Sequence, residues 1–244
     1  PVDGVSVTFA VASGGGTVDP VAAVATAGGG IATVTSWTLG TAAGTNTLTA
    51  TSGTLTGSPV TFTATGTAGA ATTSAVNAGN AQTATVGTAV AVDPSVLVTD
   101  ANGNPVSGVS VTFAVTGGGG SATGLSATTN ASGVATVTSW TLGTVAGADT
   151  DTLTATSGTL TGSPVTFTAS AAAGVATQIA VNAGNNQSAT VGSAVATDPS
   201  VIVRDQYGNP VDGVSVTFAV ASGGGPVDPV AAVATAGGGL ATVT

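Results

Sequence analysis

The chain has 244 residues and a net charge of −9, with ten acidic residues, one basic residue and no His, Cys or Met. Every acidic residue is Asp and the basic residue is Arg204, so side chains that supply acid–base catalysis near neutral pH are scarce. The absence of Cys and His excludes ordinary zinc and iron–sulfur sites. The negative charge argues against a nucleic-acid partner. We therefore expect no enzymatic activity.

The first predicted strand lies near the beginning of the chain. Apolar residues alternate with small or polar ones over residues 5–11, so Val7 and Phe9 point to the same face of an extended strand. The same alternation predicts further strands around residues 31–39, 48–50, 60–64 and 96–98. No apolar run approaches the roughly 20 residues of a membrane-spanning helix, so we expect no membrane insertion by this segment.

The alternation changes parity within residues 31–39. Ala32 and Val34 occupy even positions, whereas Trp37 and Leu39 occupy odd positions. One extra residue would place both sets on the inside, which predicts a β-bulge at residues 35–36 and another at the matching residues 138–139.

Clusters of Gly, Asn, Asp and Pro separate the predicted strands, for example at residues 14–16, 57–59 and 102–105. Such residues tolerate the backbone conformations of tight turns. Short strands with turn signals every 8–12 residues are typical of an antiparallel sandwich of about seven strands. No stretch has helical periodicity. The sequence therefore predicts an all-β fold.

Internal repeats dominate the sequence. Residues 4–11 return unchanged at 108–115 and 213–220, at successive offsets of 104 and 105 residues. Residues 47–64 and 152–169 are identical. A period of this length is a whole domain, because the units of solenoid proteins are only roughly 20–50 residues long.

The repeat predicts three segments. Residues 69–173 form one complete domain, residues 1–68 are the rear part of another, and residues 174–244 are the front part of a third. Residues 1–35 and 210–244 differ at only two pairs of positions, Thr17/Pro226 and Ile31/Leu240.

Two arrangements follow from the incomplete outer segments. In the first, the sequence is an excerpt from a longer covalent array whose neighbouring repeats are its partners. In the second, separate chains supply each other's missing strands and form a non-covalent fibre. The sequence leaves both open.

The motifs of each copy resemble a known family. The order is D-x-x-G-N-P-V-x-G-V-x-V-x-F from Asp100 and Asp205, G-x-A-x-V-x-x-W-x-L-G-T around Trp37 and Trp140, then T-L-T-A and P-V-x-F-x-A. This order resembles the bacterial immunoglobulin-like repeats of the invasin/intimin type. The resemblance implies immunoglobulin-like antiparallel β-sandwiches joined end to end in surface adhesins and extracellular rods.

The aspartates are the candidate functional residues. Asp100 and Asp205 open the D-x-x-G-N-P turns, where they are candidate Ca²⁺ ligands at a domain junction, because Ca²⁺ prefers carboxylate and carbonyl oxygens. An Asx turn, in which the side chain binds its own backbone, is the simpler interpretation. Asp149 and Asp151 lie two positions apart and are weaker Ca²⁺ candidates. No cofactor is otherwise required.

The expected function is mechanical. We expect a stalk or fibre segment at the cell surface or outside the cell, stiffened by short junctions and bundled in some cases with further copies. A Ca²⁺-dependent or glycan-binding adhesion module is one alternative, with Trp37 and Trp140 stacking on sugars if they are exposed. An accessory domain of a secreted enzyme is another.

Overall fold

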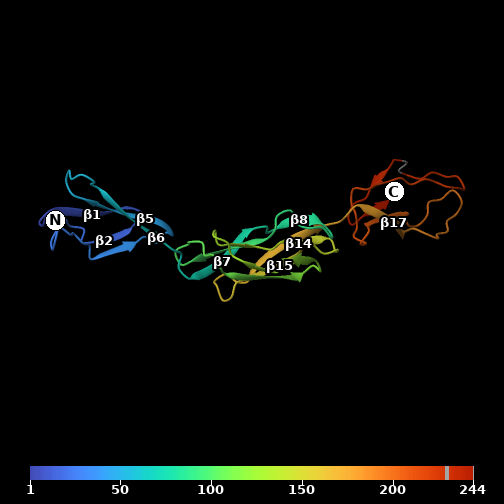
Figure 1. Cartoon of the computed structure of the whole chain (residues 1–244). Helices are drawn as coiled ribbons and strands as arrows, with labels where there is room; N and C mark the ends of the chain where they lie inside the picture. Colours follow the sequence, from blue (N-terminus) through green and yellow to red (C-terminus); the bar gives the residue numbers. More distant parts are fainter. Residues whose placement is uncertain (229–230, 244) are drawn as a thin grey trace.

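The computed structural model describes residues 1–228 and 231–243. These residues form strands, turns and loops without a helix, which confirms the all-β class, and hence the described part offers no helix that could cross a membrane. Figure 1 shows three bodies that follow one another in a line from the N-terminus to the C-terminus. We call them the N-terminal segment (residues 1–68), the central segment (69–173) and the C-terminal segment (174–244).

The central segment is a two-layered sandwich. Its strands are β7 (Ala71–Ala78), β8 (Gln82–Thr85), β9 (Ser95–Asp100), β10 (Ser110–Gly117), β11 (Ser121–Thr123), β12 (Ser126–Thr128), β13 (Val134–Thr136), β14 (Ser139–Thr141), β15 (Gly147–Thr156) and β16 (Val165–Ala172). One sheet has the order β12-β10-β15-β16-β8 and the other has the order β13-β9-β7, while β11 pairs with β14. Strands β8 and β16 are parallel, and the other pairs of this segment are antiparallel.

The core of the central segment lies between the two sheets. Trp140, Phe113 and Phe167 are fully buried there. Buried and more exposed residues alternate along β10 and β16, as the two-residue period of a strand requires.

The N-terminal segment has only part of this sandwich. Its strands are β1 (Ser6–Ser13), β2 (Gly16–Asp19), β3 (Val24–Ala25), β4 (Ser36–Leu39), β5 (Gly44–Thr51) and β6 (Val60–Gly66). The sheet β3-β1-β5-β6 matches β12-β10-β15-β16 of the central segment, and β2 pairs with β4. Residues 1–68 are all described, and they contain no counterpart of β7, β8 or β9.

The C-terminal segment has the complementary part. Its strands are β17 (Ala176–Ala183), β18 (Ser200–Asp205), β19 (Ser215–Val216), β20 (Val233–Ala234) and β21 (Leu240–Thr242). The sheet β17-β18-β21 matches β7-β9-β13, and β19 pairs with β20. Counterparts of β15 and β16 are absent from residues 174–228 and 231–243.

The change of parity has a different cause from the predicted bulges. Strand β13 pairs with β9, whereas β14 pairs with β11. Between Thr136 and Ser139 the chain therefore leaves the sheet β13-β9-β7 and joins β11 in a separate two-stranded sheet, and Val137 and Trp140 are both buried. The position of the shift is confirmed, but a bulge within one continuous strand at 138–139 is wrong. At residues 35–36 there is no strand before β4, which begins at Ser36, so no bulge lies within a continuous strand there either.

Each segment has its own hydrophobic cluster. The central cluster includes Trp140 and Phe113, the N-terminal cluster includes Phe9 and Leu48, and the C-terminal cluster includes Val203. The exact boundaries at 68/69 and 173/174 remain predictions from the repeat.

Candidate functional site

The D-x-x-G-N-P motif forms a closed turn at the end of β9. Asp100 Oδ1 accepts hydrogen bonds from the backbone N–H of Asn102 at 2.8 Å and from that of Asn104 at 2.9 Å. The Asn104 side chain also donates from Nδ2 to Asp100 Oδ2 at 2.9 Å. This is an Asx turn, which is the structural interpretation given above for the motif.

The same turn also reaches the preceding segment. Asn104 Nδ2 donates to the carbonyl oxygen of Thr41 at 2.8 Å, and Asn104 Oδ1 accepts from the N–H of Ala43 at 2.8 Å. The linker is held as well, because the N–H of Gly69 donates to Asp100 Oδ2 at 2.8 Å. The turn therefore binds both the loop between β4 and β5 and the linker.

The second boundary repeats these contacts. Asn209 Nδ2 donates to the carbonyl oxygen of Thr144 at 2.9 Å, and its Oδ1 accepts from the N–H of Ala146 at 2.8 Å. The N–H of Gly174 donates to Asp205 Oδ2 at 2.9 Å. We call the two sets the first joint (Thr41, Ala43, Gly69, Asp100, Asn104) and the second joint (Thr144, Ala146, Gly174, Asp205, Asn209).

The N–H donors favour the charged form of both aspartates. The hydrogen bonds from the Asn104 side chain and the Gly69 backbone lower the pKa of Asp100 from 3.8 to about 2. Burial alone would raise the pKa of Asp205, but the bonds from Asn209 and Gly174 outweigh it and lower that pKa below 3.8. Each joint is therefore built around a carboxylate ion.

The second joint has one further contact. Gly87, in the turn after β8, has a φ of +69°, and a Cβ there would lie 3.0 Å from Tyr207 Oη. Tyr207 belongs to the Asp205 turn, so its ring end lies against the central segment. Only glycine combines this backbone conformation with so close an approach.

The predicted Ca²⁺ ligands lie in different surroundings. Asp100 and Asp205 occupy separate joints, Asp149 is exposed, and Asp151 is fully buried. Asp151 accepts hydrogen bonds from the N–H of Gly143 at 2.7 Å and from Thr150 Oγ1 at 3.2 Å.

Ca²⁺ binding at these aspartates stays a prediction. At Asp100 and Asp205 a cation would have to displace N–H donors from both carboxylate oxygens. Over residues 1–228 and 231–243, no three His, Cys, Asp or Glu side chains are grouped closely enough to hold a metal ion.

The tryptophans belong to the sandwich interior. Trp140 is fully buried in the central core, and its counterpart Trp37 is half-buried in the smaller N-terminal cluster. The indole Nε1 atoms of both are buried without a hydrogen-bond partner. Trp140 is therefore a core residue and not a surface platform for a sugar.

The role of the two joint asparagines was not predictable from the sequence. Asn104 and Asn209 stood out only as turn residues, although each binds two backbone groups of the preceding segment. The D-x-x-G-N-P motif recurs in the sequence, and so does the Trp-Thr-Leu-Gly that precedes each contacted loop, but recurrence alone does not pair one stretch with the other. Nothing in the sequence relates these two stretches, which lie about 60 residues apart and in different segments.

Solved structures share this architecture. The Escherichia coli adhesin FdeC matches with a TM-score of 0.53 and 20% identity, over 100% of this chain and 78% of that chain. Yersinia pseudotuberculosis InvD matches with a TM-score of 0.54 and 18% identity, over 99% of this chain and 72% of that chain. The D0-D1 domain of intimin matches with a TM-score of only 0.30 and 23% identity, over 69% of this chain and 80% of that chain.

No family model matches the sequence, and no curated protein matches it either. At identities of 18% and 20% the likeness to InvD and FdeC establishes the fold. The chain therefore has the fold of the tandem bacterial immunoglobulin-like domains of surface adhesins, the fold that its repeated motifs predict.

Proposed function

We propose that this chain is a spacer segment of a bacterial extracellular fibre or adhesin stalk, and that it catalyses no reaction. Its role is to hold what lies beyond it at a fixed distance from the cell. The main support for the proposal is that the same set of hydrogen bonds connects adjacent segments at both boundaries.

A spacer must resist bending where its domains meet. The linkers between strands are short, residues 67–70 before β7 and residues 173–175 before β17. Each joint adds contacts on two sides of the boundary, to the linker and to the preceding loop. Hydrogen bonds to a charged group are stronger than neutral ones, so several such bonds acting together favour one orientation of the two segments.

The fold supports the same proposal. FdeC, which shares the arrangement over the whole chain, is described as an adhesin. A cell-surface or extracellular location follows by analogy with that protein. The partners of this chain are then its neighbouring repeats and, in a fibre or bundle, further copies.

Distances between spin labels on adjacent segments test the stiffness of the joint. The chain contains no Cys, so Thr61→Cys and Ala114→Cys, both at exposed strand positions, give two unique labels across the first joint. Double electron–electron resonance on the labelled chain should give a narrow distribution of distances between the two labels. Asn104→Ala removes the contacts to Thr41 and Ala43 and should broaden it.

Asn130→Ala is the matched control, because Asn130 Oδ1 binds only the backbone of its own turn at Ser132 and Val134. This variant should leave the distribution narrow. A distribution that is already broad in the parent chain, or that Asn104→Ala leaves unchanged, contradicts a stiff spacer.

A further inference from the structure

The two joints differ in the chemistry of one turn residue. The first turn reads D-A-N-G-N-P from Asp100 and the second reads D-Q-Y-G-N-P from Asp205, so Tyr207 stands where the first joint has Asn102. Asn102 and Gly103 form the single Asn-Gly pair of the chain. The backbone nitrogen after an Asn can attack the side-chain amide carbon, and Gly hinders this attack least because it has no Cβ. Only the first joint therefore contains a side chain suited to this reaction.

Asn102 and Gly103 lie on the open side of the first turn. Both residues are exposed, and the hydrogen bond of Asn102 within the turn uses its backbone N–H and leaves its side-chain amide free. Gly103 has a φ of +82°, and a Cβ built on it would meet no atom within 4 Å. Neighbouring atoms therefore leave room for a ring that joins the Gly103 nitrogen to the Asn102 side chain.

The closed turn restrains the reaction. The N–H of Gly103 donates to the Asp100 carbonyl oxygen at 3.1 Å, and the N–H of Asn102 donates to Asp100 Oδ1 at 2.8 Å. To attack, the Gly103 nitrogen must lose its proton and turn toward the Asn102 side chain, which these bonds oppose. The reaction therefore requires the turn to open, and its rate follows the fraction of time that the turn is open.

We propose that Asn102 is a site of spontaneous amide hydrolysis, that the closed turn restrains this reaction, and that the conversion permanently loosens the first joint. The Gly103 nitrogen loses its proton and bonds to Asn102 Cγ, and the bond from Cγ to the side-chain nitrogen breaks and releases ammonia. Water then opens the succinimide ring at either carbonyl, which gives aspartate or isoaspartate. The sum is the hydrolysis of one amide to a carboxylate and ammonia, and the loosening rests on the stiff joint of the proposed spacer.

The products do not fit the closed turn. Asp100 Oδ1 binds the backbone N–H groups of both Asn102 and Asn104, and isoaspartate inserts an extra carbon into the main chain between these donors. Either product also adds a negative charge close to the ionised Asp100 carboxylate, which it repels. Asn104 holds Thr41 and Ala43, so its displacement releases the preceding segment.

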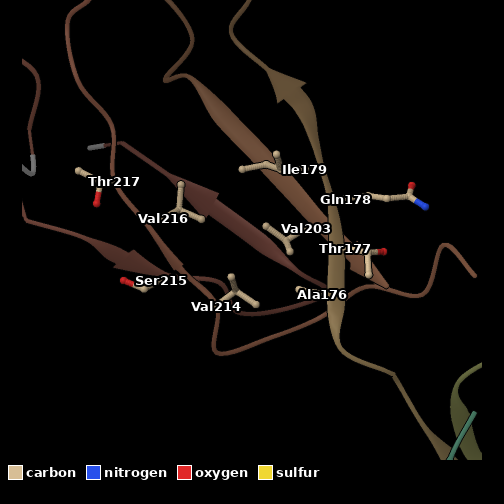
Figure 2. Close-up of a pocket in the computed structure, with 9 residues that line it drawn as sticks. All are labelled: Ala176, Thr177, Gln178, Ile179, Val203, Val214, Ser215, Val216 and Thr217. Carbon is tan, nitrogen blue, oxygen red and sulfur yellow. The ribbon is translucent and has the colours of Figure 1, made fainter. Parts of the chain in front are cut away.

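The change is confined to the first joint. The strand β9 leads into the first turn and is anchored by Val96 and Val98, which have no exposed surface, so the sandwich keeps its core. At the second joint β18 leads into the turn, and its Val203 points into the same hollow as Val216 (Figure 2). The turn there carries Tyr207, which has no amide to hydrolyse.

Peptide mass spectrometry of the full chain, incubated in mildly alkaline buffer, tests the modification. Residue 102 should exchange –NH2 for –OH, and an isoaspartate form should separate from the aspartate form by chromatography. Asn130 is the internal control, because it also lies in a closed turn but precedes Ala131, and it should stay intact. If Asn102 stays intact in the folded chain after the urea-unfolded chain has been fully converted, the proposal is overturned.

Asp100→Ala tests the restraint by the turn. This variant removes the carboxylate that holds Gly69, Asn102 and Asn104, so the conversion of Asn102 should become faster by about tenfold or more. Asn130→Ala, which removes a side chain outside the joint, should leave the rate unchanged. Equal rates in Asp100→Ala and the parent overturn the proposal, because the turn would then not restrain the reaction.

Spin labels report whether the conversion loosens the joint. With labels at residues 61 and 114, the distance distribution should broaden as the modified fraction grows. It should stay narrow in Asn102→Gln, which keeps the backbone bonds of the turn and has a side chain too long to form the same ring. Labels at residue 114 and at Gln178, which points away from the C-terminal hollow (Figure 2), span the second joint and should keep a narrow distribution.

Two results contradict the loosening. A fully modified chain with a narrow distribution at the first joint overturns the proposal, and so does equal broadening at the second joint, because the change would then not come from Asn102. Failure of the stiff spacer is distinct from both, since it appears as a broad distribution before any incubation.

Discussion

Asp100 is the residue that makes the first joint sensitive to pH. Its carboxylate binds the linker at Gly69, the turn at Asn102 and the amide of Asn104. An ionised carboxylate accepts all these bonds, whereas a protonated one turns one oxygen into a donor that faces N–H groups. The protonation of one side chain therefore opposes the closed joint.

Acid should loosen this joint in a defined window. Because the pKa of Asp100 is lowered from 3.8 to about 2, its stabilising contribution is fully present above about pH 4 and is lost as the pH falls through about 2. In the chain labelled at residues 61 and 114, the distance distribution should broaden over that interval.

Asp100→Asn is the comparison for the acid prediction. This variant cannot titrate, so its distribution should not change further in the same window. Broadening that begins well above pH 4, or equal acid sensitivity in Asp100→Asn, would show that other groups control the joint.

At the scale of elements, identical sequence has different consequences in different segments. Residues 47–64 and 152–169 are the same, and both form a hairpin of two long antiparallel strands, β5 with β6 and β15 with β16. Only β16 is covered by a second layer, so Phe167 is buried and Phe62 is half-exposed. Local sequence sets the hairpin, and the opposing sheet sets how much each side chain contributes to stability.

The two phenylalanines should therefore differ in substitution cost. Phe167→Ala should lower the free energy of unfolding of the central segment by about 3–5 kcal/mol, because it leaves a cavity in a closed core. Phe62→Ala should cost about 1 kcal/mol, because roughly half of that side chain is already in contact with water. Urea titration at a concentration where the chain is monomeric measures both, and equal costs contradict the burial difference.

The alternation of apolar residues was sufficient to predict where strands lie, but not which strands pair with one another. Alternation located β1, β6 and β9, and the parity shift before Trp140 marked a real irregularity. The predicted bulge there was wrong because an extra residue has the same alternation pattern whether a strand bulges or ends and changes sheets. Only the pairing partners, β9 for β13 and β11 for β14, distinguish the two.

At the scale of the whole molecule, the three segments form a line in which each has a separate core (Figure 1). Among residues 1–228 and 231–243, the central cluster holds fifteen buried residues, whereas each outer cluster holds three. Since burial of apolar surface is the main source of folding free energy, stability must be unevenly distributed along the chain.

Unfolding of the monomeric chain should occur in separate steps. The outer segments should lose structure first and the central segment last. Hydrogen exchange should give amides of β10 and β15 the greatest protection and those of β17 and β19 the least. In Trp37→Phe, the remaining Trp140 emission should report only the late step. One cooperative transition at all these probes contradicts the ordering.

The sequence by itself determined the all-β class, the repeat length, the position of most strands and the family that the fold resembles. These follow from the alternation of apolar and polar residues, from the turn residues and from the internal repeats. All three can be seen in the sequence without knowing which residues meet in space. The tertiary structure alone decided that Asn104 and Asn209 bind the preceding segment, that β13 and β14 belong to different sheets, and that identical residues differ in burial. Those outcomes depend on which distant backbone groups meet in space, and a contact between residues about 60 positions apart leaves no periodic trace in the sequence.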